Sequence, residues 1–121
     1  MDNTFKENEK IYRAVCPPEV ADMFWRKDGS VSSAAFADPK GLSVDRGDFR
    51  TDNEVKADMQ KRFSGMIIRL YAKNCTGIGA VLRYMPSKSN PYHSELHGSK
   101  SNKLLSKQQR LFLSRKAIIL G

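Results

Sequence analysis

The sequence predicts a single α+β domain in which a mostly antiparallel or mixed sheet of about five or six short strands is covered by two helices. Its 121 residues match the size of one domain. Short runs rich in β-branched and aromatic residues recur between clusters of Gly, Pro and Asp, which is typical of strands and turns. Two longer segments instead combine a helix-capping pattern with apolar residues at helical spacing.

The N-terminal part is expected to begin with a flexible tail. In residues 1–9 no apolar residue recurs apart from Phe5, so the folded domain is predicted to cover 10–121. Prolines and turn residues then separate the predicted elements. These are strands at 11–15, 31–36 and 42–46, and between the first two a short helix at 19–25 with Val20, Met23 and Phe24 facing inward.

Two segments predict the main helices. Thr51 and Glu54 have the spacing of a capping box, and Val55, Met59 and Phe63 follow at intervals of four as one buried stripe. A second helix is predicted at 104–116, and a capping box between Ser106 and Gln109 would move its start to about Lys107. The remaining strands are predicted at 66–72, 80–84, 92–96 and 117–120.

The positive charge is concentrated in the C-terminal part of the chain. Residues 1–74 hold 13 Lys/Arg and 12 Asp/Glu, whereas residues 75–121 hold 8 Lys/Arg and one acid, Glu95. This asymmetry indicates an anionic partner, most often a nucleic acid, although a solubilising surface has the same composition.

The second main helix carries the predicted nucleic-acid-binding residues. Lys103, Lys107, Arg110 and Ser114 recur at spacings of four, three and four, which aligns them on one helical face, and Lys100 precedes them. Tyr84 and Tyr92 bracket a nearby loop and could stack on bases, as on a single-strand or RNA surface. An amphipathic helix packed on a sheet would look much the same. Because no RNP, KH or zinc-finger motif is present, sequence-specific readout is not predicted.

The segment His93-Ser94-Glu95-Leu96-His97 is the sharpest local pattern. In an extended strand its two histidines and its carboxylate project to one face, where they could bind a transition metal or act as acid and base. Alternatively, Glu95 pairs with a nearby Lys or Arg, and one or both histidines are surface residues. The P-C-x-x-C that accompanies the H-x-E of zinc deaminases is absent. We predict no metal site and no cofactor.

A second cluster predicts a phosphate site formed by Arg13, Ser32, Ser33 and Arg46. A guanidinium binds phosphate oxygens in pairs, and serine hydroxyls add donors. Together with residues 93–97, this cluster suggests an alternative function. The protein would be a small enzyme or toxin-like protein that acts on a nucleotide or RNA through Arg13, His93 and Glu95. The simpler interpretation is an ion pair between Arg13 and Asp45 beside ordinary sheet serines.

Several protein classes are not expected. No apolar run approaches the roughly 18 residues of a membrane span, and the polar N-terminus does not resemble a signal peptide, so we expect a cytoplasmic protein. Cys16 and Cys75 are expected to be reduced thiols. No P-loop, GxGxxG, GxSxG or HExxH motif is present.

A protein-interaction module, including a homodimer, is the third functional alternative.

Four short segments together resemble one group of proteins. They are Arg13-Ala14-Val15, Ser32-Ser33-Ala34-Ala35-Phe36, Leu42-Ser43-Val44-Asp45-Arg46 and Pro91-Tyr92-His93-Ser94-Glu95-Leu96-His97-Gly98. In this order they are similar to the R-x-[VI], S-S-x-x-F, L-S-V-D-R and P-x-H-x-x-[LIV]-x-G signatures of small uncharacterised bacterial proteins, over about residues 10–120. The resemblance puts Arg13, Ser33, Phe36, Ser43, Asp45, Arg46 and His93 at signature positions. It implies no activity, and His97 matches no fixed position.

Overall fold

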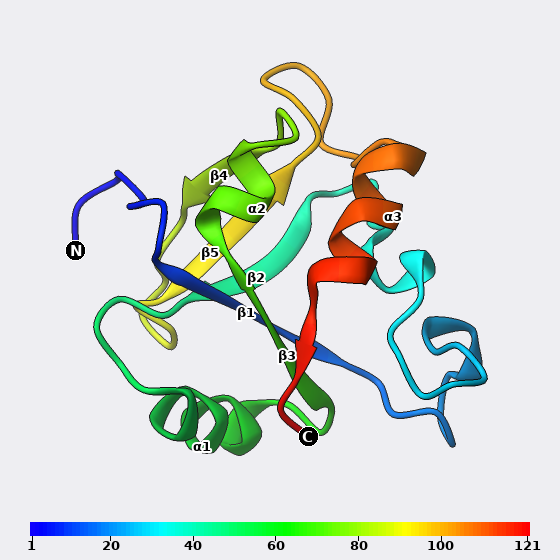
Figure 1. Cartoon of the computed structure of the whole chain (residues 1–121). Coiled ribbons are helices and arrows are strands. Elements are labelled where there is room, and N and C mark those ends of the chain that lie inside the picture. Colours follow the sequence, from blue (N-terminus) through cyan, green and yellow to red (C-terminus); the bar gives the residue numbers. More distant parts are fainter.

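Six extended segments pair into one antiparallel sheet in the order β4-β5-β2-β1-β3-β6. The structure is a computed structural model that describes residues 1–121 (Figure 1). The strands are β1 (Lys10–Val15), β2 (Leu42–Arg46), β3 (Met66–Tyr71), β4 (Val81–Tyr84), β5 (His93–His97) and β6 (Ile118–Ile119). The predicted α+β class and antiparallel sheet are confirmed.

The main core lies on one face of the sheet. Because side chains alternate along a strand, Ile11, Val44, Ile68 and other apolar residues of four strands point to this face, where they are buried. Helix α3 (Lys107–Lys116), the short helix α2 (Ala72–Thr76) and two 3₁₀ turns, η1 (Asp22–Phe24) and η2 (Ser33–Phe36), cover this face (Figure 1). Leu113 of α3 and Phe36 of η2 are fully buried there.

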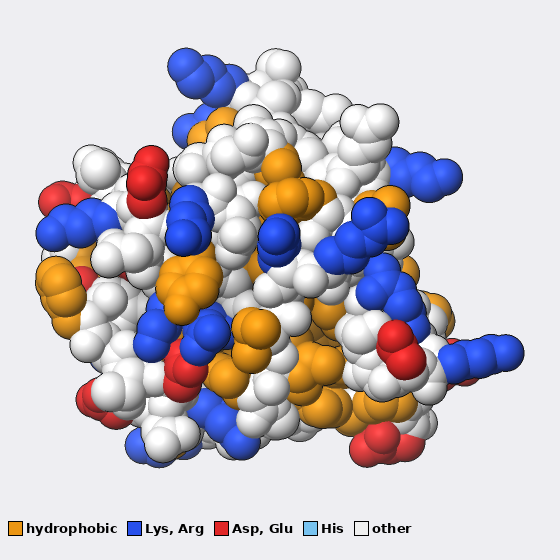
Figure 2. Space-filling view, viewed as in Figure 1, with side chains coloured by type: hydrophobic (Ala, Val, Ile, Leu, Met, Phe, Trp, Pro, Cys, Tyr) orange, Lys and Arg blue, Asp and Glu red, His pale blue; other side chains and the backbone are white.

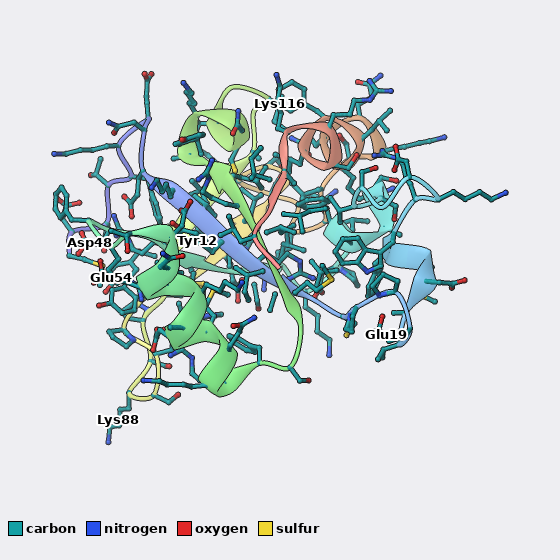
Figure 3. The ribbon with its side chains drawn as sticks, turned by 60° about the horizontal axis from the view of Figure 1, so that its bottom comes forward. Tyr12, Glu19, Asp48, Glu54, Lys88 and Lys116 are labelled. Carbon is teal, nitrogen blue, oxygen red and sulfur yellow. The ribbon has the colours of Figure 1, made fainter.

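Helix α1 (Asp52–Arg62) covers only part of the opposite face. Val55 and Met59 pack against Tyr12 of β1 and Ile67 of β3, and Figure 3 shows Tyr12 beneath this helix. The other half of the face belongs to β2, β5 and β4. There the register aligns Ser43, Glu95 and Arg83, all of them polar. The site described below lies at the boundary between these two halves.

Both predicted capping boxes are confirmed. Thr51 Oγ1 accepts a hydrogen bond of 3.2 Å from Glu54 N, and Glu54 Oε1 accepts one of 3.1 Å from Thr51 N. Ser106 and Gln109 repeat the arrangement at 3.1 and 2.8 Å. Each box satisfies two main-chain N–H groups that have no partner within the helix, so the starts of α1 and α3 are encoded locally.

Three local predictions are wrong. The strand at 31–36 is replaced by η2, and Val31 alone forms a bridge, with Trp25, because both edges of β1 are already occupied by β2 and β3. The helix at 19–25 shrinks to η1, since Ala21 offers no side-chain oxygen to cap it, and Val20 and Met23 are 71% and 63% exposed. Phe63 follows the last residue of α1 in an extended conformation and is 42% exposed. Helix α2 was not predicted.

The first nine residues contain no helix or strand, but Arg46 binds them. Its Nη1 donates to Asp2 O (2.6 Å), its Nη2 donates to Thr4 O (3.1 Å), and its guanidinium lies 4.2 Å from the centre of the Phe5 ring. Glu9 adds an ion pair to the same guanidinium, so the segment that the sequence suggests to be a flexible tail is attached to Arg46 of β2 at Asp2, Thr4, Phe5 and Glu9.

Candidate functional site

A pocket of about 460 Å³ opens where β1 and β2 separate. These strands pair only at Ile11–Arg46 and Tyr12–Asp45, and the gap beyond is bordered by the end of α1 and by the loop between β4 and β5. Twelve residues line the pocket, four of them hydrophobic. The hydrophobic residues are Ala14, Val44, Met59 and Phe63, and the polar ones are Arg13, Ser43, Asp45, Arg62, Ser87, Ser89, Asn90 and His93.

Arg13 closes the gap between the two strands. Its Nε donates to Ala35 O (3.0 Å) and its Nη1 donates to Ser43 O (2.9 Å), so it replaces main-chain bonds that the separated strands cannot make. The ion pair with Asp45 that the simpler interpretation expected is not formed, and no carboxylate lies within 4 Å of the guanidinium. Burial lowers the pKa of Arg13, against an opposing effect of the more distant Asp38 charge.

Asp45 is instead held by the two elements that flank the pocket. Its Oδ2 accepts a hydrogen bond from Arg62 Nη2 (2.8 Å), and its Oδ1 accepts one from Asn90 Nδ2 (2.9 Å). The carboxylate is 3% exposed, and Arg62 balances its charge. Sequence reasoning missed Arg62 and Asn90, because nothing in the sequence links them to an acid 17 and 45 residues away.

His93 lies opposite Asp45 in the pairing of β5 with β2. Its main-chain N–H donates to Asn90 O (3.3 Å), which fixes the start of the strand. Its half-buried ring lines the pocket and makes no hydrogen bond to the protein. The structure thus brings two of the three predicted catalytic residues, Arg13 and His93, to one pocket.

The third, Glu95, belongs to a separate network and does not line this pocket. Arg83 Nε donates to His97 Nδ1 (3.1 Å), so the ring proton of a neutral His97 resides on Nε2, which donates to Glu95 Oε1 (2.8 Å). His97 is buried rather than a surface residue. No three His, Cys, Asp or Glu side chains cluster closely enough to hold a metal ion.

The predicted phosphate site is divided. Arg46 is buried, and Glu9, Asp2 and Thr4 accept from its guanidinium. It lines a different hollow, so it does not join Arg13. Ser32 Oγ donates to Met23 O (2.6 Å), and Ser33 begins η2. The prediction grouped these residues on neighbouring strands, but 31–36 is not a strand.

The predicted basic residues lie together on α3 and the loop before it. Lys100, Lys103 and Lys107 are exposed, while Arg110 is half-buried and donates to Leu105 O (2.9 Å). Ser114, expected on the same face, is 3% exposed and accepts from Arg26 Nη2 (2.8 Å), so this end of the face turns inward.

Arg115 and Lys116 extend the basic surface at the end of α3. Both are exposed, and the sequence prediction missed them because it followed a face that ended at Ser114. None of the six cations of this surface lies within 4 Å of a carboxylate. Figure 2 shows Lys and Arg side chains over α3, whereas the red acidic side chains lie on the left of the view and in its lower part, including the lower right below α3.

Tyr84 and Tyr92 do not belong to this surface. They flank the loop between β4 and β5, at the opposite end of β5 from α3 (Figure 1). Tyr84 lies over Arg46 (4.8 Å) and Tyr92 over Arg50 (3.3 Å), and Tyr84 Oη donates to Pro91 O. These aromatic rings bind arginines of the same chain instead of offering faces to bases beside α3.

None of the helices combines the length and the apolar character that crossing a membrane requires. The chain matches no family model, no curated protein and no solved structure.

Proposed function

We propose that this protein is a binding domain that contacts nucleic acid through the basic surface of α3 and the loop before it. The observation that carries the proposal is that its cations have no carboxylate partner. They are Lys100, Lys103, Lys107, Arg110, Arg115 and Lys116.

Four of the twelve acids of the first half are paired within that half. Glu9, Asp45, Asp52 and Asp58 each bind a lysine or an arginine of residues 1–74, so these four charges are balanced there. Since no carboxylate lies within 4 Å of the C-terminal cations, their field is not cancelled locally near α3, and at physiological salt it acts over roughly 8 Å. A polyanion approaching this side is attracted.

The basic surface of α3 offers no free aromatic ring, and this determines how it would contact a nucleic acid. Phe112, the aromatic residue of α3, is half-buried, and Lys116 Nζ lies 5.5 Å from its ring centre. Binding through phosphates without base stacking is independent of the base sequence, so we replace the single-strand preference expected from Tyr84 and Tyr92 with backbone contact.

Fluorescence anisotropy with labelled duplex and single-stranded oligonucleotides tests this function. If all six cations contact phosphates, the logarithm of the duplex affinity falls with the logarithm of salt with a slope of about −5. The triple variant Lys103→Glu/Lys107→Glu/Arg110→Glu is expected to abolish binding. The control Lys6→Glu/Lys27→Glu/Lys61→Glu changes the same net charge at exposed sites outside this surface and should retain most of it. Equal losses in both variants, or no binding at 50 mM salt, would refute the proposal.

The enzymatic alternative requires Arg13, His93 and Glu95 to act on one substrate. Two of them line a common pocket, but the Glu95 carboxylate is bonded to His97 and lies outside the lining. We therefore propose binding rather than catalysis.

As part of the same proposal we place the protein in the cytoplasm, where nucleic acid is available and the exposed Cys16 stays reduced. The third alternative, a homodimer, would appear as a doubled mass in analytical ultracentrifugation.

A further inference from the structure

We propose that the pocket between β1, β2 and the end of α1, named here the Arg13 pocket, binds a small molecule that carries a phosphate group and a flat apolar ring. A nucleoside monophosphate represents this class. The inference is independent of the basic surface on α3, because none of that surface's cations lines the pocket.

The first argument is an uncompensated charge. Arg46 and Arg69 of the sheet, Arg62 of α1 and Arg50 of the loop between β2 and α1 each have a carboxylate within 4 Å. Arg83 of β4 has none and donates instead to His97 Nδ1 in a separate network. Arg13 has none, although burial disfavours its charged form. Charged groups removed from water are normally paired, so a cation held only by two main-chain carbonyls lacks a counter-ion. An anion bound in the pocket would supply it.

The second argument is the set of donors that the protein leaves unused. The hydrogen bonds of Arg13 to Ala35 O and Ser43 O use Nε and Nη1, and Nη2 has no protein partner. The imidazole of His93 is also free of protein hydrogen bonds, as is the exposed hydroxyl of Ser43. These donors come from three adjacent strands, and all three residues line the pocket. This arrangement suits the several oxygens of a phosphate better than the two coplanar oxygens of a carboxylate.

The one acid in the lining does not oppose an anion. Asp45 is bonded to Arg62 and Asn90, and the pair with Arg62 is electrically neutral. The sum of charges at the pocket is therefore positive, owing to Arg13. Without Arg62, the carboxylate of Asp45 would cancel that charge, so the end of α1 contributes to anion binding indirectly.

The third argument is the apolar wall. Met59 and Phe63 line the pocket from α1 and the residue after it, and the Phe63 ring is 42% exposed, so part of it is accessible to a ligand. The volume of about 460 Å³ lies in the range of small-molecule sites, which combine apolar walls with a few polar groups. An aromatic ring lying against Phe63 would cover this side chain, while the phosphate reaches Arg13.

Isothermal titration of the full chain with AMP and UMP, at 50 mM salt, tests the proposal. We expect one molecule bound per chain, and at least tenfold weaker binding of adenosine, which lacks the anion, and of inorganic phosphate, which lacks the ring. Equal binding of benzoate would show that a carboxylate satisfies the site and would overturn the assignment to phosphate. No heat from either nucleotide up to millimolar concentration would overturn the proposal altogether.

Two variants locate the ligand without disturbing protein hydrogen bonds. His93→Gln and Phe63→Ala change side chains that make none, and each is expected to weaken AMP binding at least tenfold while thermal unfolding shows that the fold is retained. The control is Lys88→Met, in the loop between β4 and β5 that borders the pocket. Lys88 is exposed, does not line the pocket and points away from the molecule in Figure 3, so its variant should bind AMP as the unchanged chain does.

The basic surface on α3 provides the last control. The variant Lys103→Glu/Lys107→Glu/Arg110→Glu should keep its affinity for AMP, because these residues lie outside the pocket. If it loses AMP binding while His93→Gln and Phe63→Ala keep it, the nucleotide is bound by the basic surface and the Arg13 pocket is not its site. Failure of oligonucleotide binding alone leaves the pocket result unaffected, so the two proposals fail separately.

Discussion

Asp45 of β2 and Arg62 at the end of α1 form an ion pair of 2.8 Å across the edge of the Arg13 pocket. The carboxylate is buried and the guanidinium is one-quarter exposed. The ion pair attaches α1 to β2, in the half of the sheet face that α1 does not cover. The positive charge of Arg62 also cancels the one negative charge in the pocket lining. Stability and the proposed binding of a phosphate-bearing ligand therefore depend on the same contact.

Replacing Asp45 with Ala is expected to lower the free energy of unfolding by about 3 kcal/mol, because Arg62 and Asn90 both lose their partner. Urea denaturation measures the change. The control is Asp58→Ala, which removes the other carboxylate bound to Arg62. Since Asp58 is one-third exposed, we expect a loss below about 1 kcal/mol. Equal losses would mean that burial of Asp45 does not strengthen the pair.

Acid is expected to destabilise the protein partly through Asp52. Burial acts to raise the pKa of Asp52, but the hydrogen bond from Tyr12 and the charges of Arg69 and Lys10 outweigh it and hold the pKa below its usual range. A lowered pKa in the folded state means that the contribution is complete above the unfolded value of about 3.9 and is lost as the pH falls below it.

Urea denaturation between pH 5 and pH 2 tests this expectation. Asp52→Asn should flatten the decline in stability relative to the unchanged chain, because the variant has no carboxylate to protonate. Asp22→Asn, at an exposed acid without a side-chain hydrogen bond, should leave the decline unaltered. An identical decline in all three proteins would show that other carboxylates govern acid unfolding.

The two cysteines should differ sharply in reactivity. Burial raises the pKa of the Cys75 thiol to about 12, so almost no thiolate forms at neutral pH, whereas Cys16 is exposed. Titration with a chromogenic disulfide reagent at pH 8 is expected to detect one thiol in the native protein and two in denaturant. Cys16→Ser should remove the native reaction, and rapid reaction of both thiols would contradict the burial of Cys75.

Gly41 is expected to tolerate no larger side chain. Its φ is +100°, and a Cβ atom there would lie 2.6 Å from Glu95 Oε1 and 2.9 Å from His97 Nε2. We expect Gly41→Ala to lower the free energy of unfolding by more than about 2 kcal/mol, since backbone strain and displacement of the Glu95–His97 bond add together. Gly29→Ala has a similar φ of +88° but no atom within 4 Å, so it measures strain alone, expected at about 1 kcal/mol. Equal effects would exclude a role for the clash.

Much of the fold could be predicted because the signals are local. The capping boxes at Thr51 and Ser106 need residues only three positions apart, and the alternation of β2 follows from the geometry of a single strand. The prediction was wrong at 31–36, where the choice between strand and turn depended on whether β1 had a free edge. The predicted burial of Phe63 was wrong because the regular spacing of apolar residues along a helix does not show where the sheet surface that covers them ends.

The sequence by itself determined the two capped helices, most of the strands, the α+β class and the uneven charge, since each of these depends on neighbouring residues or on composition. Only the tertiary structure decided which charges meet. Arg13 and His93 are separated by 80 positions and come together because β2 lies between their strands, while Asp45 takes Arg62 and leaves Arg13 without a counter-ion. An ion pair depends on distance in space and on exclusion from water, and a sequence records neither.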